Sequence, residues 1–322
     1  MDDIRKILVT GATSMIGVSV IAAALCDDSI EKIYAVVKPG SIKTERICKS
    51  ERIKILYCDC MHYDRLPELV DDKIDVFYHL AWPRTPTYKE SIEELIDKSY
   101  QLGGVIRAVE VASRLGARKF IGAGTQAEYG IKNEVLKPST SCNPVRADGI
   151  LKLAAGQLAM EVSRSFGIIC IWMRIFSIYG RYDRKDSMIM TTVAKLLRNE
   201  YCQFTPSEQI WDYLYEDDAG RAFWLAAKEI NKSRVFCLAS GTSMPLREYI
   251  NVIRNVVAPN AKIGIGELPY PVNPVMQLRA DISDLQRETG WTPQITFEEG
   301  IKNVCEYLQR GGNRDIVKES SE

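Results

Sequence analysis

The stretch KILVTGATSMIG at residues 6–17 decides the fold, because a short β-rich run leads directly into a turn with a glycine at each end. Gly11 permits a tight turn after the strand, and Gly17 lets the following helix pack closely on it. The small residue Ser14 stands where a middle glycine is usual. Such a turn aims the amino end of a helix at an anion, so the stretch predicts a diphosphate-binding turn. Its predicted binding residues are Gly11, Thr13, Ser14, Met15, Ile16 and Gly17.

Strand-like and helix-like segments alternate along the first half of the chain. The strand-like runs are nearly continuous in apolar residues, which is typical of a parallel sheet covered on both faces. The expected strands are 6–10, 32–38, 52–58, 75–81, 118–124 and 168–176, and the expected helices are 15–26, 90–114 and 148–166. The pattern predicts an α/β fold with a Rossmann-type doubly wound parallel sheet.

The regular alternation fades after Gly180. A helix over 214–228 and a strand over 234–240 still fit the pattern, whereas the remaining stretches carry more proline and short segments. We therefore expect a dinucleotide-binding domain over 1–180 plus about 213–240, and a smaller, partly interleaved α+β substrate domain over 181–212 and 241–322. The small domain is expected to lean over the carboxyl ends of the strands.

The amino-acid composition indicates which classes of binding partner and which cellular compartment to expect. The 322 residues are 46% hydrophobic and 26% charged with zero net charge, which favours small molecules or other subunits over nucleic acid or an anionic membrane. Nine scattered cysteines favour a reducing cytoplasm, and no apolar run is long enough to cross a bilayer. Cys58, Cys60 and His62 resemble metal ligands, but no fourth ligand can be placed, so no metal is expected.

The end of the second predicted strand reads VVKPGS at residues 36–41. An acidic residue there would bind the 2′-hydroxyl of NAD, whereas a cation accommodates the 2′-phosphate of NADP. Lys38 and Ser41 therefore favour NADP over NAD, although Lys38 is also explained as a solvated loop lysine. Further cofactor contacts are expected after the third strand and in HLAW at 79–82, from Asp59, Cys60, Leu80, Ala81 and Trp82.

Taken together, these motifs resemble the extended short-chain dehydrogenase/reductase family, in its nucleotide-sugar epimerase, dehydratase and reductase branch. The similar stretches span nearly the whole chain: TGATSMIG (10–17), HLAW (79–82), GAGTQAEYG (122–130), the region of Lys152, RIFSIYG (174–180), WDYLYEDDAGRA (211–222) and ETGWTPQITFEEGI (288–301). The resemblance implies NADP or NAD as cofactor and a nucleotide sugar as substrate. It also implies a homodimer formed through helices 90–114 and 148–166.

The family uses a Ser or Thr, a Tyr and a Lys for catalysis, and by resemblance these positions are Thr125, Asp148 and Lys152. The departure lies at Asp148, where the family has Tyr. A tyrosine hydroxyl has a reference pKa near ~10 that a nearby lysine lowers, while an aspartate near ~3.9 is already ionised. We expect Asp148 to be a first-turn carboxylate that pairs with Lys152 at i,i+4. The alternative is a catalytic role through a bridging water or with a substrate proton.

Other departures restrict the reaction. By resemblance, Ser99 and Ser177 replace asparagines that hold the lysine with its water and contact the substrate. Gln126 and Ala127 replace the acidic pair of 4,6-dehydratases, which leaves 4-keto reduction or epimerisation. Other acids that could replace the tyrosine, each also explained structurally, are Tyr88, Glu128 and Tyr129.

The predicted substrate-binding residues are Tyr88, Gln126, Arg174, Ser177, Tyr179, Trp211 and Asp212. Arg174 is expected to clamp a diphosphate with its planar guanidinium. Trp211 replaces an arginine that is common in relatives. Two hypotheses follow: an NAD(P)-dependent enzyme acting on a nucleotide sugar, and a catalytically impaired relative that binds the cofactor as a scaffolding subunit.

Overall fold

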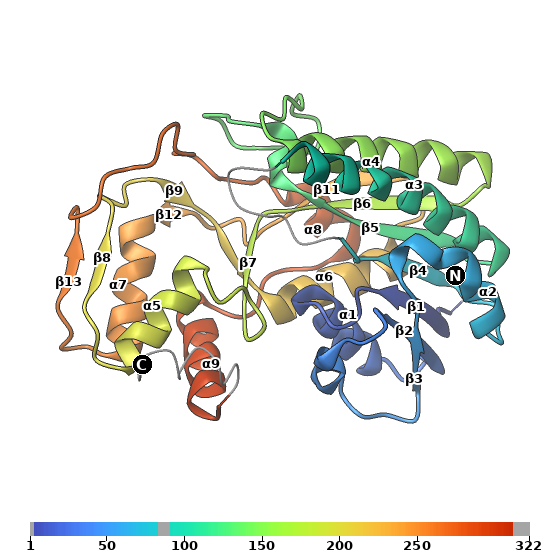
Figure 1. Ribbon diagram of the computed structural model, residues 1–322, viewed down its shortest axis with the longest axis horizontal. Coiled ribbons are helices and arrows are strands. Elements are labelled where there is room, and N and C mark those ends of the chain that lie inside the picture. The colour runs from blue at the N-terminus through green and yellow to red at the C-terminus, as the bar shows by residue number, and fades with distance from the viewer. Residues whose placement is uncertain (1–2, 83–90, 312–322) are drawn as a thin grey trace.

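The structure, a computed structural model, describes residues 3–82 and 91–311. Seven strands form one parallel sheet in the order β3–β2–β1–β4–β5–β6–β11 (Figure 1). They are β1 (Lys6–Thr10), β2 (Lys32–Val37), β3 (Ile53–Tyr57), β4 (Val76–His79), β5 (Lys119–Thr125), β6 (Ile169–Ile175) and β11 (Arg234–Leu238). The predicted Rossmann-type sheet is confirmed, with strand bounds close to those expected from the sequence.

Alternate residues of each strand enter two hydrophobic cores, one on each face of the sheet. Ile7 and Val9 of β1 belong to the core that α1 and α6 complete, whereas Leu8 belongs to the core that α3 and α4 complete. The elements are α1 (Met15–Leu25), α2 (Leu66–Leu69), α3 (Ile92–Arg114), α4 (Ala147–Ser165), α6 (Glu216–Glu229) and the 3₁₀ helices η1 (Ile42–Arg46), η2 (Cys60–Arg65) and η3 (Gln126–Tyr129). Coverage of both faces explains why the strands are almost wholly apolar.

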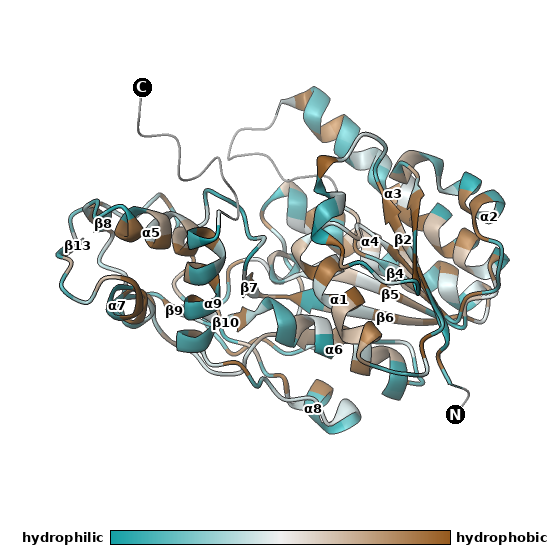
Figure 2. Cartoon of the chain, turned by 90° about the horizontal axis from the view of Figure 1, so that it is seen from below, coloured by the Kyte–Doolittle hydropathy of each residue, from teal (hydrophilic) through white to brown (hydrophobic). Residues whose placement is uncertain are grey.

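A third core lies beside the sheet and joins helices to short strand pairs (Figure 1, Figure 2). Its helices are α5 (Met188–Leu197), α7 (Leu246–Val257) and α9 (Phe297–Gln309). The short strands pair as β7 (Ser177–Tyr179) with β10 (Tyr213–Tyr215), β8 (Cys202–Phe204) with β13 (Ile263–Ile265), and β9 (Ile210–Trp211) with β12 (Met244–Pro245). The mixture agrees with an α+β region, while the domain boundaries stay a prediction.

Helix α8 (Ser283–Thr289) packs against α6 and β11, and its Leu285 belongs to the core of the sheet. Part of the segment expected in the small domain thus lies on the sheet. In the part of the chain that the structure describes, no helix is both long and apolar enough to span a membrane.

Candidate active site

The crevice between the carboxyl ends of β1 and β4 lies where the strand order reverses, which is the usual ligand site of a doubly wound sheet. Gly11 leaves β1 with a φ of +67°, a conformation that glycine adopts without strain. A Cβ atom at Gly11 would lie 2.7 Å from the Ala81 nitrogen, and one at Gly17 would lie 2.3 Å from the Gly11 carbonyl oxygen. Close backbone approach therefore requires both glycines.

The turn ends at Ser14, whose hydroxyl caps α1 by accepting a hydrogen bond of 3.0 Å from the Gly17 N–H. Thr13, Met15 and Ile16 are partly exposed around it. The first N–H groups of a helix have no partner within the helix and attract an anion. The turn thus fits the diphosphate of a nicotinamide dinucleotide.

Residues from the ends of β2 and β3 lie together beside this turn. Lys38 is 79% exposed at its side chain, and its Nζ lies 3.8 Å from an Asp59 carboxylate oxygen. Asp59 caps η2 through the Met61 N–H, and Cys60 Sγ lies 3.5 Å from Asp59 Oδ1. Ser41 caps η1 and accepts a bond from the Lys43 N–H. The predicted cofactor residues of the two strand ends are therefore neighbours.

Sequence reasoning missed Arg46, the last residue of η1. Its Nη1 donates to the Thr13 carbonyl oxygen at 3.4 Å, and its guanidinium carbon lies 4.7 Å from the centroid of the Tyr182 ring. Arg46 is therefore held against the glycine-rich turn, whereas Lys38 extends into solvent. The cluster of cations in SIKTER at 41–46 was the only sequence signal for it.

The end of β4 packs under the glycine-rich turn. Thr10 Oγ1 accepts hydrogen bonds from the N–H groups of Leu80 at 3.2 Å and Ala81 at 3.3 Å. Burial, with a smaller contribution from Lys152, lowers the pKa of His79 to about 3, so this imidazole is neutral. These contacts fix the backbone of the HLAW segment at the edge of the crevice.

Lys152 of α4 contacts the end of this segment. Its Nζ donates a 2.7 Å hydrogen bond to the Ala123 carbonyl oxygen of β5 and lies 3.9 Å from the centroid of the Trp82 ring. Burial lowers the pKa of the amine to about 7, although Glu128 acts in the opposite direction. The predicted site residues Trp82 and Lys152 are thus in direct contact.

Asp148 does not pair with Lys152, so the predicted i,i+4 ion pair is wrong. The Asp148 carboxylate lies in the first turn of α4 with Oδ1 3.4 Å from Arg146 Nε. That oxygen is buried and has no hydrogen-bond partner among the described residues. The lysine side chain instead reaches β5 and Trp82, because a carbonyl oxygen and an aromatic face lie on that side.

Thr125 ends β5 and opens η3. Its Oγ1 accepts a 3.3 Å hydrogen bond from the Ala127 N–H, and the Glu128 carboxylate accepts one of 2.8 Å from the Thr125 N–H. The O–H of Thr125 therefore stays available as a donor. Gln126 is the next residue and is partly exposed at the same edge.

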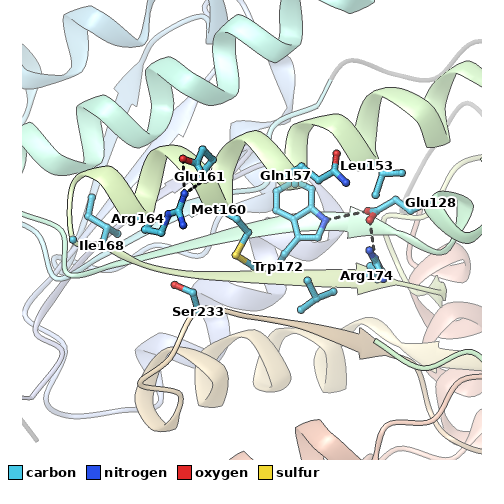
Figure 3. A pocket seen from close by; sticks show the side chains of 13 residues that line it. Glu128, Leu153, Gln157, Met160, Glu161, Arg164, Ile168, Trp172, Arg174 and Ser233 are labelled. Atoms are coloured by element: carbon cyan, nitrogen blue, oxygen red, sulfur yellow. Dashed lines mark hydrogen bonds and ion pairs between the residues drawn. The ribbon is translucent and has the colours of Figure 1, made fainter. Parts of the chain in front are cut away.

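Glu128 forms the centre of a buried polar cluster (Figure 3). Its Oε1 accepts hydrogen bonds from the Thr125 N–H and from Trp172 Nε1 at 3.0 Å, and its Oε2 accepts one of 2.7 Å from Arg174 Nε. Only 1% of the Glu128 side chain and 8% of the Arg174 side chain are exposed. The cluster closes one end of a groove of about 580 Å³ between α4 and strands β6 and β11.

These contacts differ from the roles that the sequence predicted for several site residues. Arg174 also donates to the Pro138 carbonyl oxygen and lies over the Tyr129 ring, so its guanidinium is occupied within the protein and is not free to clamp a diphosphate. Tyr129 is fully buried, and its hydroxyl donates to the Lys137 carbonyl oxygen. Glu128 and Tyr129 therefore have structural roles, and Tyr88 lies outside the described residues.

The substrate-binding predictions beyond β6 divide into two groups. Ser177 and Trp211 come together, because Trp211 Nε1 donates a 2.8 Å hydrogen bond to Ser177 Oγ. Tyr179 is 1% exposed and donates to the Phe297 carbonyl oxygen within an aromatic cluster. Asp212 is 1% exposed and accepts bonds from the N–H groups of Ser240 and Gly241. Tyr179 and Asp212 thus support the fold behind the crevice.

Burial raises the pKa of Asp212 to about 6, which agrees with a carboxylate held inside the protein.

Ser99 is exposed on α3 and donates to the Ile96 carbonyl oxygen of its own helix. The Ser99 hydroxyl is thus engaged within α3, and the expected change in how Lys152 is held stays a prediction. Over 3–82 and 91–311, no three or more His, Cys, Asp or Glu side chains are grouped to hold a metal ion.

A doubly wound parallel sheet with a glycine-rich turn at its switch point defines the class of dinucleotide-binding α/β proteins. Thr125 and Lys152, which follow that turn along the chain, restrict the class of protein further. The chain belongs to the NAD dependent epimerase/dehydratase family, whose model matches residues 7–239. This match confirms the resemblance found in the sequence, and it places the chain in a family of NAD-dependent enzymes.

Individual relatives are distant but similar over most of their length. An uncharacterized protein of Methanocaldococcus jannaschii is 25% identical over 319 residues, which cover 94% of this chain and 96% of that protein. A UDP-glucuronate 4-epimerase of Thermodesulfobacterium geofontis is 23% identical over 279 residues, covering 84% and 83%.

Two solved structures show the same fold. The UDP-glucose 4-epimerase of Thermotoga maritima with UDP-glucose superposes with a TM-score of 0.81 at 22% identity, covering 95% of this chain and 99% of that one. The UDP-glucuronic acid 4-epimerase of Bacillus cereus with UDP-glucuronic acid and NAD gives a TM-score of 0.82 at 21% identity and the same coverage.

Proposed function

We propose that the chain catalyses NAD(P)-dependent oxidation and reduction at C4 of a nucleotide-activated sugar, as a 4-epimerase or a 4-keto reductase. The observation that carries this proposal is the arrangement of Thr125, Lys152 and the glycine-rich turn at one edge of the sheet. Relatives named as UDP-sugar 4-epimerases support the choice of substrate class.

The residues of the site have separate tasks in this proposal. When bound, the dinucleotide supplies a nicotinamide ring that accepts or returns a hydride. Thr125 donates its O–H to the oxygen on the sugar C4, because Oγ1 accepts from the Ala127 N–H and its O–H has no acceptor among the described residues. Lys152 would hold a ribose hydroxyl of the bound cofactor with its amine. Ser177, Trp211 and Gln126 contact the nucleotide sugar, and Asp212 and Tyr179 support them.

The preference for NADP over NAD is the finer part of the proposal. Lys38 and Ser41 lie at the end of β2, and Arg46 adds a cation held against the glycine-rich turn. The NAD found with the B. cereus epimerase supports NAD instead, and Asp59 beside Lys38 is an acceptor for a ribose hydroxyl. Binding of NADPH and NADH decides between them.

Elimination of water is disfavoured as the reaction. Gln126 and Ala127 carry no acidic group where dehydratases have a pair, and the Glu128 carboxylate is fully engaged with Thr125, Trp172 and Arg174. A 4,6-dehydratase needs an acid and a base, and the described residues directly after Thr125 offer no free acidic group for these tasks.

A second candidate function is cofactor binding without turnover, as a scaffolding subunit. It is favoured by Asp148, which takes the place of the family's tyrosine and whose carboxylate pairs with Arg146. An impaired enzyme would still bind the dinucleotide through the glycine-rich turn.

Purified protein incubated with NAD or NADPH distinguishes the two functions. The probes are UDP-glucose, UDP-N-acetylglucosamine, UDP-glucuronic acid and UDP-4-keto-6-deoxyglucose, and the readout is the absorbance of the reduced nicotinamide together with product analysis. An enzyme oxidises or reduces at least one probe, and Thr125→Val lowers kcat by about 10²-fold while cofactor binding is kept. Cofactor binding without turnover, together with activity gained by Asp148→Tyr, would establish the scaffolding function instead.

We also propose that two copies of the chain associate through α3 and α4. Ile92, Ile96 and Tyr100 lie four residues apart on α3 and are 72%, 48% and 57% exposed. The first turns of α3 project beyond the sheet, where a partner can cover this stripe (Figure 2).

The cytoplasm stays the proposed location, which agrees with nine free cysteines.

A further inference from the structure

We propose that the amine of Lys152 is the acid–base group of this site and moves the proton that a tyrosine at position 148 would otherwise move. The inference rests on the function proposed above and names the proton carrier of that reaction. It starts from the absence of a phenol at position 148, where Asp148 stands.

The surroundings of the Lys152 amine differ from those of a lysine that only binds an anion. Within the described residues its Nζ forms no ion pair; it donates to the Ala123 carbonyl oxygen at 2.7 Å. One face of the amine is covered by Trp82, with 3.9 Å between Nζ and the ring centroid. Ala123 lies two residues before Thr125 on β5. The amine of Lys152 is therefore bound at the same end of β5 that carries the Thr125 hydroxyl.

Among the described residues, Glu128 is the charged group that shifts the pKa of the amine, and burial opposes it. Glu128 of η3 favours the protonated amine, while His79 of β4 is neutral because it is buried. The Asp148 carboxylate on the same helix is paired with Arg146. Burial outweighs the Glu128 contribution and brings the pKa to about 7, so both forms of the amine are populated near neutral pH.

Trp82 is the positioning residue in this arrangement. Its indole excludes water from one side of the amine, which disfavours the charged form. The same ring face attracts a cation, which offsets part of that effect and keeps Nζ in place. The N–H groups of Leu80 and Ala81, directly before it, are bound to Thr10 Oγ1, so the backbone that leads to the indole is anchored under the glycine-rich turn.

The proton and the hydride balance in both directions. In reduction, C4 of the sugar receives the hydride, and its carbonyl oxygen takes a proton from the Lys152 ammonium while Thr125 holds that oxygen. The products are the 4-alcohol and a neutral amine, which regains its proton from water. In oxidation the neutral amine takes the proton of the 4-hydroxyl as the hydride leaves C4.

The first arm of the test measures the titration of the amine without substrate or cofactor. The protein is labelled with acetic anhydride over a range of pH, and the extent of acetylation at each lysine is read by peptide mass spectrometry. Lys152 is expected to titrate near the value of about 7 that burial produces, and exposed lysines in the same sample near ~10.4. Trp82→Ala raises the Lys152 midpoint by about 1 unit or more because water reaches the amine, and Trp82→Phe leaves it nearly unchanged.

The second arm follows hydride transfer in a single turnover. Lys152→Arg keeps the positive charge but does not titrate below pH ~12, so the rate is expected to fall at least ~10²-fold while NAD(P)H still binds. The pH dependence of the wild-type rate should follow the Lys152 midpoint and shift upward with it in Trp82→Ala. A merely structural lysine would not move this profile.

Three results would overturn the inference: a Lys152 midpoint above ~9, an unchanged midpoint in Trp82→Ala, or turnover by Lys152→Arg within about threefold of the wild type. Wild-type protein that transfers no hydride to or from any probe would refute the proposed function itself, and this inference with it. Turnover that persists in Lys152→Arg would refute the inference alone.

Discussion

The Glu128 carboxylate binds three donors from two strands: the Thr125 N–H at the end of β5, and Trp172 Nε1 and Arg174 Nε on β6. Removing one partner of a buried ion pair leaves the other charge uncompensated. Glu128→Ala is therefore expected to lower the free energy of unfolding by about 3–5 kcal/mol, measured by urea denaturation. Glu128→Gln, which keeps two acceptor contacts, should cost less and serves if Glu128→Ala does not fold.

The matched control is Glu161→Ala. Glu161 also binds an arginine, Arg164, but 65% of its side chain is exposed, so its removal should change the free energy of unfolding by less than ~0.5 kcal/mol. A loss below ~1 kcal/mol in Glu128→Ala would show that the cluster does not hold Thr125 as described.

Arg46 and Lys38 are two cations beside the glycine-rich turn, and the structure separates their roles. Arg46 is held by the Thr13 carbonyl oxygen and the Tyr182 ring, whereas the Lys38 side chain is 79% exposed. Arg46→Ala is expected to weaken NADPH binding about 10-fold to 100-fold, as for the loss of a charged hydrogen bond, and NADH binding less. Fluorescence titration checks this. A larger effect from Lys38→Ala would assign the 2′-phosphate to the loop lysine.

For single residues, the sequence predicted the glycine positions that the backbone requires better than it predicted the contacts of side chains. Gly11 and Gly17 were identified because their roles depend on local geometry. The Asp148–Lys152 pair was predicted from i,i+4 spacing and is wrong, since the long lysine side chain reaches Ala123 on a neighbouring strand. Such choices depend on residues far away in the sequence, which spacing along one helix cannot reveal.

At the scale of the element, the turn between β1 and α1 should be the part of the cofactor site most sensitive to added volume. In Gly17→Ala the new methyl group would meet the Gly11 carbonyl oxygen at 2.3 Å, so α1 must move away from the turn. We expect a loss of about 1–3 kcal/mol in the free energy of unfolding and a cofactor affinity at least ~10-fold weaker.

Gly103→Ala provides the control for a glycine within a helix. Nothing lies within 4 Å of a Cβ at Gly103 in α3, so the change should leave cofactor binding intact and raise stability by up to ~1 kcal/mol. Calorimetry and NADH titration of both variants give the comparison. Unchanged cofactor binding in Gly17→Ala would contradict the close packing that the structure shows.

At the scale of the whole molecule, the sheet was predictable because each βαβ unit is encoded locally by apolar runs and glycine-rich turns. The predicted strands lie in the sheet, and the order in which they pair follows from the doubly wound topology. The third core was predicted only as an α+β region, since its two- and three-residue strands pair across long stretches of chain. The packing of α8 on the sheet could not be read from its sequence either.

The exposed stripe on α3 gives a prediction about assembly. Ile96→Glu places a charge among Ile92, Ile96 and Tyr100 and should convert a dimer into a monomer, measured by sedimentation equilibrium. Val272→Glu is the matched control, because Val272 is 92% exposed and lies outside α3 and α4. A monomeric wild type, or a dimer that Ile96→Glu leaves intact, would refute association through this stripe.

The reaction proposed for this crevice is hydride transfer at C4 of a nucleotide sugar. The most direct measurement is to incubate the protein and NAD(P) with UDP-glucose, UDP-N-acetylglucosamine and UDP-glucuronic acid, each deuterated at C4, and to examine the cofactor by mass spectrometry. We expect deuterium in the reduced nicotinamide with at least one sugar, and its loss in Thr125→Val. Cofactor that binds but never acquires deuterium would contradict the account and leave a dinucleotide-binding protein without turnover.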